Sequence, residues 1–184
     1  MNDLSNLATE ETQEISMQLV IDNSEGTVLN TTKIPALYKW TTLPMHEAVV
    51  QQGLHGILIK QGLEKEQFAI YVHHTDFRHP TALVLNIIEP CTCYFFSVMG
   101  SPVFMGMDPG NLSEIVLEAR SITELKFNLV TNIHRMIFGA GTYISICVVV
   151  ADNFKYLLED EQWIYNLLME YDKMIYKPPT PGQQ

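Results

Sequence analysis

Short runs in which apolar and polar residues alternate recur along the chain from residue 17 to residue 150. A period of two places every second side chain on the same face of a β-strand, so these runs predict strands. Turn-forming clusters separate them at close intervals, which is typical of an all-β barrel or sandwich. A helical pattern before residue 152 is visible only near residues 45–52, which disfavours alternating β-α-β units. The predicted strands are residues 17–21, 27–32, 56–60, 68–73, 82–88, 92–99, 102–107, 113–117, 125–130, 133–138 and 143–150.

The end of the sequence predicts a hairpin followed by helices. Gly139-Ala-Gly141 joins the last two strands, and glycine readily takes the positive φ that tight turns need. A helical pattern begins at Asp152, a favourable N-cap residue. One slip in its spacing, at residues 159–162, predicts two helices rather than one. The apolar positions of this pattern are Phe154, Leu157, Leu158, Ile164, Leu167, Leu168, Tyr171 and Ile175.

Four parts follow from these patterns. Residues 1–14 are acidic and without periodicity, which predicts a mobile arm. Residues 15–150 form the predicted β-domain, and residues 151–176 the C-terminal helices. Residues 177–184 contain three prolines, which end the helix and predict an extended linker or tail.

Two predicted strands, residues 93–99 and 144–150, are apolar nearly throughout. A strand of this kind is buried on both faces. Their outer faces are therefore expected to be covered by the C-terminal helices or by another chain.

Composition narrows the class of protein. The chain has 184 residues, 47% of them hydrophobic, which suits a single domain with a conventional core. Its 21 acidic and 11 basic residues give a formal charge of −10, which disfavours nucleic-acid binding. No apolar run has the length of a membrane span, and the acidic N-terminus is unlike a secretory signal, so we expect a cytoplasmic protein. Three cysteines in apolar strands predict buried, reduced thiols rather than disulfides.

Candidate chemistry is sparse. His73, His74, Asp76 and His79 are the densest group of metal-ligand types, but strand-end histidines near a turn are the simpler reading, so no metal or other cofactor is predicted. Residues 139–141 are followed by a strand, whereas a dinucleotide fingerprint needs a helix there. No Gly-x-Ser-x-Gly occurs, and we expect that the chain is not an enzyme.

Aromatic residues are concentrated in the predicted strands. Alternation places Phe68, Ile70, Val72 and His74 on one face of their strand and Ala69, Tyr71 and His73 on the other. Ligand pockets are largely apolar and aromatic with a few polar anchors, although aromatics also dominate ordinary cores. The candidate ligand-binding residues are Phe68, Tyr71, His73, Tyr94 and Phe96.

The order of several short motifs resembles the N-terminal domain of AraC-type transcriptional regulators of the Bacteroidota and pyochelin-regulator kind. The motifs are Gln67-Phe-Ala-Ile-Tyr-Val-His-His74, Thr81-Ala-Leu-Val-Leu85, Thr92-Cys-Tyr-Phe-Phe-Ser-Val-Met-Gly100, Ile133-His-Arg-Met-Ile-Phe-Gly-Ala-Gly141-Thr-Tyr143, Asn153-Phe-Lys-Tyr-Leu-Leu-Glu159 and Trp163-Ile-Tyr-Asn-Leu-Leu168.

This resemblance implies a cupin-like β-barrel or sandwich sensor over residues 15–150 with two C-terminal α-helices. It further implies an unknown small-molecule effector, a homodimer, and DNA binding only through a downstream domain, because no basic recognition helix follows Pro181. The apolar helix stripe then has two candidate roles, dimerisation or packing on its own barrel, of which packing is the commoner. The stripe consists of Ile164, Leu167, Leu168, Tyr171 and Ile175.

The leading hypothesis is therefore a ligand-sensing and dimerisation domain of an AraC-like regulator, in which the effector shifts the arrangement of the helices. One alternative is a metal-dependent cupin-like enzyme that uses the His73 to His79 cluster. Another is a ligand-free interaction module, which a solid barrel interior would favour.

Overall fold

The computed structural model describes residues 17–22, 26–41, 43, 47–65, 68–108, 111–128, 133–158 and 162–175. The predicted arm at residues 1–14 and linker at residues 177–184 lie outside these residues. The elements are β1 (Met17–Ile21), β2 (Leu29–Thr31), η2 (Ala36–Thr41), β3 (Ala48–Gln52), β4 (Gly56–Glu64), β5 (Phe68–Phe77), β6 (Thr81–Ile87), β7 (Cys91–Met99), β8 (Val103–Asp108), β9 (Asn111–Val116), β10 (Ile122–Phe127), β11 (Ile133–Phe138), β12 (Gly141–Ala151), η3 (Asp152–Leu158) and α1 (Gln162–Ile175).

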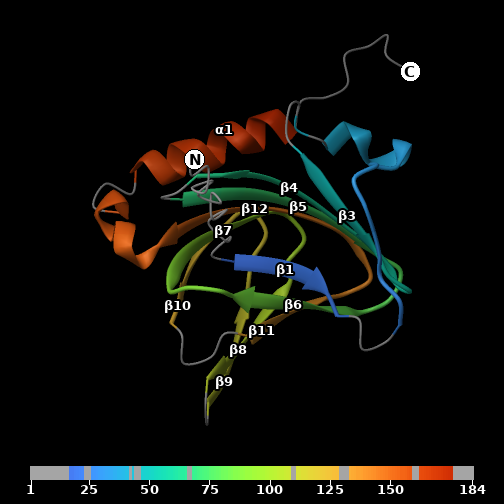
Figure 1. The fold of residues 1–184 in the computed structure, drawn as a ribbon, viewed down its shortest axis with the longest axis horizontal. Coiled ribbons are helices and arrows are strands. Elements are labelled where there is room, and N and C mark those ends of the chain that lie inside the picture. Colours follow the sequence, from blue (N-terminus) through green and yellow to red (C-terminus); the bar gives the residue numbers. More distant parts are fainter. Residues whose placement is uncertain are drawn as a thin grey trace, which may run out of the picture.

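The strands form two antiparallel sheets that face each other (Figure 1). One sheet has the order β1-β6-β11-β8-β9 and the other β10-β7-β12-β5-β4-β3-β2. From β5 onward consecutive strands pass from one sheet to the other, except in the β8–β9 hairpin, as in double-sheet jelly rolls. Within the described ranges no ladder joins the two sheets, so the expected mainly-β fold is confirmed as a sandwich and not as a closed barrel.

A buried cluster fills the space between the sheets, and a second lies between the seven-stranded sheet and α1. Figure 1 shows α1 lying across the outer face of this sheet. Ile164, Leu168, Tyr171 and Ile175 are buried in that interface, and Leu167 packs at its edge. Helix α1 is thus the cover that the apolar strands β7 and β12 require, and the stripe packs on its own sheet.

The expectation of two C-terminal helices is wrong, because α1 is the one α-helix in the described part of the chain. Residues Asp152–Leu158 form a 3-10 segment in which Phe154 has φ −112° and ψ 23°. The Phe154 side chain packs into the cluster beneath α1, and its backbone leaves the helical region to reach it. The helix suggested by the pattern near residues 45–52 is also wrong, since strand β3 lies there.

Candidate functional site

A row of polar side chains crosses the inner face of the seven-stranded sheet. Lys60 of β4 is the register partner of His73 of β5, and His73 is the partner of Ser145 of β12. Ser145 is in turn the partner of Ser97 of β7. These four side chains point toward the opposing sheet. Tyr71 lies two residues before His73 and Cys147 two residues after Ser145, so alternation places them on the same face, and both belong to the cluster between the sheets. We refer to Lys60, His73, Ser145 and Ser97 as the polar row.

His73 is the most deeply buried titratable member of the row, with 2% of its surface exposed. Its Nδ1 atom lies 3.7 Å from Cys147 Sγ, and its ring stacks on that of Tyr71 with centroids 6.0 Å apart. Burial, and then the charge of Lys60, lowers the pKa of His73 to about 3. His73 is therefore neutral at pH 7, and its Nε2 atom has no hydrogen-bond partner among the described residues.

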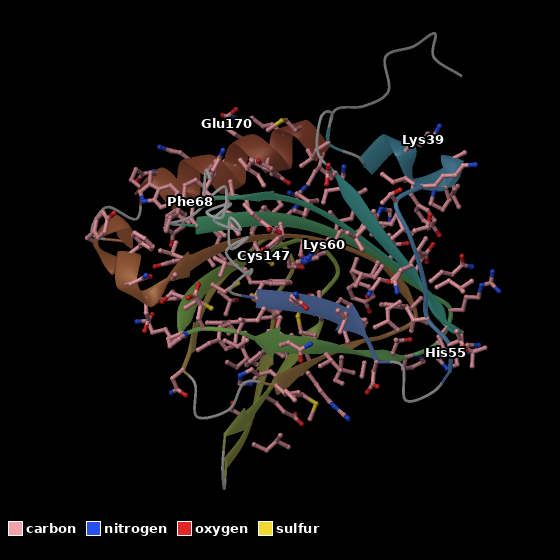
Figure 2. All side chains as sticks on the ribbon, viewed as in Figure 1. Lys39, His55, Lys60, Phe68, Cys147 and Glu170 are labelled. Carbon is pink, nitrogen blue, oxygen red and sulfur yellow. The ribbon has the colours of Figure 1, made fainter. Side chains whose placement is uncertain are left out.

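Lys60 and Tyr71 form the outer end of the site. Lys60 is partly exposed, and its Nζ atom lies 4.9 Å from the centroid of the Tyr71 ring. In Figure 2 Lys60 lies between the seven-stranded sheet and β1. Burial lowers the pKa of Lys60, against an opposing effect of Glu64. Burial and then the charge of Glu64 raise the pKa of Tyr71, although its hydroxyl makes no hydrogen bond of good geometry within the described part of the chain.

A cavity of about 10 Å³ adjoins the inner end of the row, between His73, Thr75, Ser97 and Ser145. This is close to the smallest space that holds one water molecule. The Thr75 hydroxyl is buried and has no partner within the described ranges, whereas Ser97 Oγ donates to the carbonyl of Gly100. The rest of the lining is largely apolar and includes Met99, Phe138 and Ile144.

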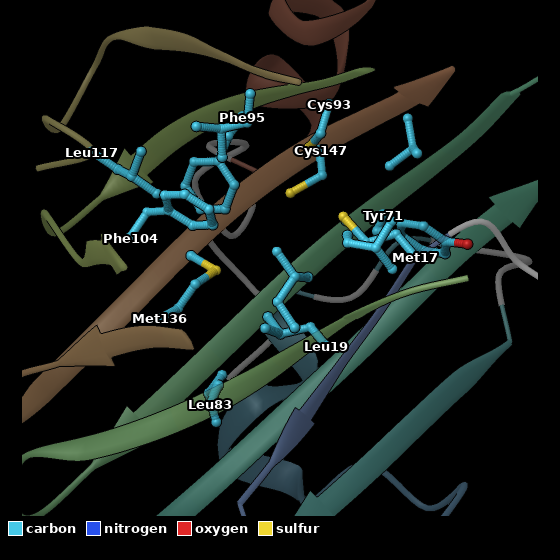
Figure 3. Packing of buried hydrophobic residues seen from close by; sticks show 14 of the residues in the cluster. Met17, Leu19, Tyr71, Leu83, Cys93, Phe95, Phe104, Leu117, Met136 and Cys147 are labelled. Carbon is cyan, nitrogen blue, oxygen red and sulfur yellow. The ribbon is translucent and has the colours of Figure 1, made fainter. Parts of the chain in front are cut away.

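Elsewhere the space between the sheets is filled by side chains. Figure 3 shows Phe95, Phe104, Leu117 and Met136 packed together there. Two larger cavities lie at the margins of the sandwich. One, of about 130 Å³, is lined by residues that include His55, Phe77 and Arg135. The other, of about 190 Å³, is lined by residues that include Phe104, Phe127 and His134.

The five residues predicted to bind a ligand do not lie together. Tyr71 and His73 face the interior between the sheets. Tyr94 and Phe96 belong to the cluster beneath α1, and Phe68 packs there against Trp163 with ring centroids 5.8 Å apart. Sequence reasoning missed Lys60, although its signal was present: Lys60 has the same strand phase as buried Leu58.

The histidine cluster is also divided. His73 and His74 lie on opposite faces of β5, and the His74 ring meets that of Tyr38 at 5.0 Å. Asp76 accepts a hydrogen bond of 2.9 Å from the Tyr38 hydroxyl, while exposed His79 packs against His55. No three metal-ligand side chains come together in the described part of the chain. The enzyme alternative therefore lacks the ligand set on which it depended.

Cys91, Cys93 and Cys147 are buried and unbridged, as expected. Among the described residues, no helix is both long and apolar enough to cross a membrane.

The chain is thus a jelly-roll-type β-sandwich with a polar row between its sheets. No family model and no curated protein matches its sequence. It is similar to solved structures of cupin and double-stranded β-helix proteins. A double-stranded β-helix protein from Klebsiella pneumoniae is 15% identical, with a TM-score of 0.40, and the match covers 67% of this chain and 93% of that one. An RmlC-like cupin protein from Desulfovibrio desulfuricans is 14% identical, with a TM-score of 0.37, and the match covers 51% of this chain and 81% of that one.

An enzyme is also among these structures. Hydroxypropylphosphonic acid epoxidase from S. wedmorenis is 13% identical, with a TM-score of 0.37, and the match covers 50% of this chain and 49% of the epoxidase, about half of its length. Our expectation that the chain is not an enzyme is corrected by this finding, because the absence of a nucleophile motif does not exclude catalysis. The resemblance to AraC-type regulators stays a prediction, since no such regulator is among the structures named here.

Proposed function

We propose that the chain is a small-molecule-binding domain and that its ligand binds at the partly exposed Lys60 end of the polar row, against Tyr71 and His73. The observation that carries the proposal is the buried Nε2 atom of His73, which no described residue satisfies. An unsatisfied buried polar group costs about 1–3 kcal/mol of stability. Groups of this kind are rare in native proteins and call for an explanation such as a bound molecule.

The side chains at this end of the polar row indicate a ligand with oxygen atoms. The Lys60 amine and the hydroxyls of Tyr71 and Thr75 offer hydrogen-bond donors, and neutral His73 offers one donor and one acceptor. Buried Leu58 and Met17 belong to the same interior and supply apolar surface. Few polar anchors in an apolar setting are typical of small-molecule sites. Entry is expected at the Lys60 end, where the row is partly exposed.

A sensing role follows if the ligand alters the packing of α1. Strands β5 and β12 carry His73 and Ser145 of the polar row on one face and contact the cluster beneath α1 through Val72, Ile144 and Ile146 on the other. A ligand that prefers one arrangement of these strands would shift the population of α1 positions. This is the coupling that a regulatory domain of the AraC-like kind requires, with DNA contacted by residues outside this chain.

Thermal unfolding in the presence of small carboxylic, hydroxy and oxo acids tests the binding proposal. A ligand at a concentration of 100 times its Kd raises the free energy of unfolding by about 2.7 kcal/mol, which corresponds to a Tm increase of roughly 5–10 °C for a domain of this size. We expect the increase in wild type and in Lys126→Met, an exposed control, and its loss in Lys60→Met. An unchanged Tm with every compound, or an equal increase in the two variants, would reject the proposal.

A ligand-free interaction module is the second candidate, favoured by the close packing between the sheets. Its surface would be β9, an edge strand of the five-stranded sheet on which Leu112, Ile115 and Val116 are exposed. Unpaired edges of this kind readily pair with another chain. Light scattering on wild type and Val116→Lys tests this candidate. If β9 joins two copies of the chain, wild type should be a dimer and the variant a monomer. A monomeric wild type would contradict a homodimer built on β9.

A further inference from the structure

We propose that Lys60 is a carbonyl-capturing amine and that the domain binds a small aldehyde or ketone as an imine on Lys60 Nζ. This inference rests on the proposed function, because it assigns a chemical class to the ligand proposed to bind beside Lys60.

Lys60 differs from the other lysines that the structure describes. Lys33, Lys39, Lys65, Lys126 and Lys173 are exposed, whereas Lys60 is partly buried. Lys126 lies 3.1 Å from a Glu124 oxygen, and Lys173 lies 2.6 Å from a Glu170 oxygen. Within the described ranges no carboxylate comes within ion-pair distance of Lys60. An amine in this setting holds its proton less tightly, consistent with the lowered pKa of Lys60, and the neutral amine is the nucleophile.

The surroundings of Lys60 provide the other groups that the reaction needs. The amine lies over the face of Tyr71, and His73 is its direct cross-strand neighbour. Tyr71 keeps its hydroxyl proton because burial and Glu64 raise its pKa, and neutral His73 carries one ring proton. Both can therefore donate a hydrogen bond to a carbonyl oxygen held beside Lys60.

The reaction is balanced without a co-reactant. The lone pair of Lys60 Nζ forms a bond to the carbonyl carbon, and the π electrons of the C=O bond move to the oxygen, which takes up a proton. The nitrogen loses a proton to a neighbouring base, which gives a neutral carbinolamine. Protonation of its hydroxyl group then lets the C–O bond break and water leave while the nitrogen lone pair forms the C=N bond, and the resulting iminium ion loses its N–H proton to give the neutral imine. The proton donors are restored, so the net change is amine plus carbonyl compound to imine plus water.

The apolar interior would protect the product. Met17 and Leu19 of β1 belong to the same buried cluster as Tyr71, and Figure 3 shows Met17 beside that ring. Hydrolysis of an imine requires water at its carbon atom, and a site that excludes water slows that step.

Reductive trapping of the full chain tests the inference. Acetaldehyde or pyruvate is added at pH 7 with sodium cyanoborohydride, which reduces the imine to a stable secondary amine, and peptide mass spectrometry measures modification at each lysine. We expect Lys60 to be modified faster than Lys126 and Lys173 in the same molecules, because its lowered pKa leaves a larger fraction of its amine neutral at pH 7. The ratio should fall at pH 10, where the exposed amines also lose their protons.

Modification of Lys60 no faster than that of Lys126 at pH 7 would overturn the inference. Lys60→Arg, which keeps a cation at this position, provides a matched variant whose other lysines should be modified as in wild type. The outcome is separable from that of the binding proposal. If oxo acids raise Tm through Lys60 but no trapped adduct forms there, binding stands and imine formation fails.

Discussion

The ring of Tyr71 lies against the backbone of Gly62: a Cβ atom at residue 62 would come within 2.7 Å of Tyr71 Cδ1. The two residues are register partners on β4 and β5. Gly62 thus leaves the space in which the ring packs beneath Lys60. A residue without a side chain is required here by close packing rather than by an unusual backbone conformation.

Gly62→Ala should therefore destabilise the protein and displace Tyr71. Overpacking of a filled interior typically costs about 1–3 kcal/mol. Urea denaturation measures the loss in the free energy of unfolding. Gly139→Ala is the control, because residue 139 is exposed and an added Cβ meets only the Tyr143 hydroxyl, at 3.0 Å. A loss no larger at Gly62 than at Gly139 would show that the Tyr71 ring is free to move.

Leu168→Ala should destabilise the chain by about 2–5 kcal/mol, because it removes a fully buried side chain from the interface between α1 and the sheet. Met169→Ala, one position along the helix, removes a side chain that is 37% exposed and should change stability by no more than about 0.5 kcal/mol. Chemical denaturation of both variants makes the comparison. Similar losses would contradict the packing of the stripe on its own sheet.

The faces of individual strands were predictable because alternation is a local property. The division of β5 into a face with Phe68, Ile70, Val72 and His74 and a face with Ala69, Tyr71 and His73 was predicted correctly. The hairpin expected at residues 139–141 is wrong, because β11 pairs with β6 and β8 in one sheet and β12 pairs with β5 and β7 in the other. Gly141, with φ +133°, lies where the chain passes from one sheet to the other. Alternation fixes the faces of a strand locally, whereas the partner of a strand depends on residues that are distant in sequence.

The site was not predictable, because it depends on register between strands that are distant in sequence. Alternation alone could place Tyr94 and Phe96 on either face of the sheet, and the structure places them beneath α1. The pairing of Lys60 with His73, and of His73 with Ser145, depends on which residues of β4, β5 and β12 lie opposite one another. Whether the apolar stripe meets its own sheet or a second chain is likewise not encoded in helical spacing.

Arg120 adopts a left-handed backbone conformation, with φ +65°, in the loop before β10. Its amide donates a 2.7 Å hydrogen bond to the carbonyl of Ser97, a member of the polar row. Its Nη1 atom lies 2.8 Å and 3.0 Å from the two carboxylate oxygens of Asp172 on α1. The loop is thereby tied to both the sheet and the helix.

Arg120→Gly should be more stable than Arg120→Ala by about 1 kcal/mol, since glycine adopts positive φ without the steric penalty of a Cβ atom. Both variants lose the contact with Asp172, so the difference between their free energies of unfolding measures the cost of the positive φ angle alone. The ion pair itself should contribute no more than about 1 kcal/mol, because Arg120 is 49% exposed. A double-mutant cycle with Asp172→Asn measures that part, and an alanine variant as stable as the glycine variant would contradict the backbone argument.

Acid should destabilise the protein through His73. In the folded chain burial and then the charge of Lys60 hold the pKa of His73 at about 3, against an ordinary value of 6.5. Between these two values the unfolded chain binds a proton that the folded chain does not, so the free energy of unfolding falls as the pH falls from about 6.5 toward 3. Each unit of pKa difference corresponds to about 1.36 kcal/mol, so the loss from this residue amounts to a few kcal/mol.

Urea denaturation from pH 7 to pH 4 should show a shallower decline for His73→Gln than for wild type, because the variant has no imidazole to protonate at this position. His79→Gln removes an exposed histidine and should follow the wild-type slope. Parallel slopes for wild type and His73→Gln would show that His73 is not held neutral in the folded chain, and the assignment of its ring as a neutral partner for a ligand would then fail.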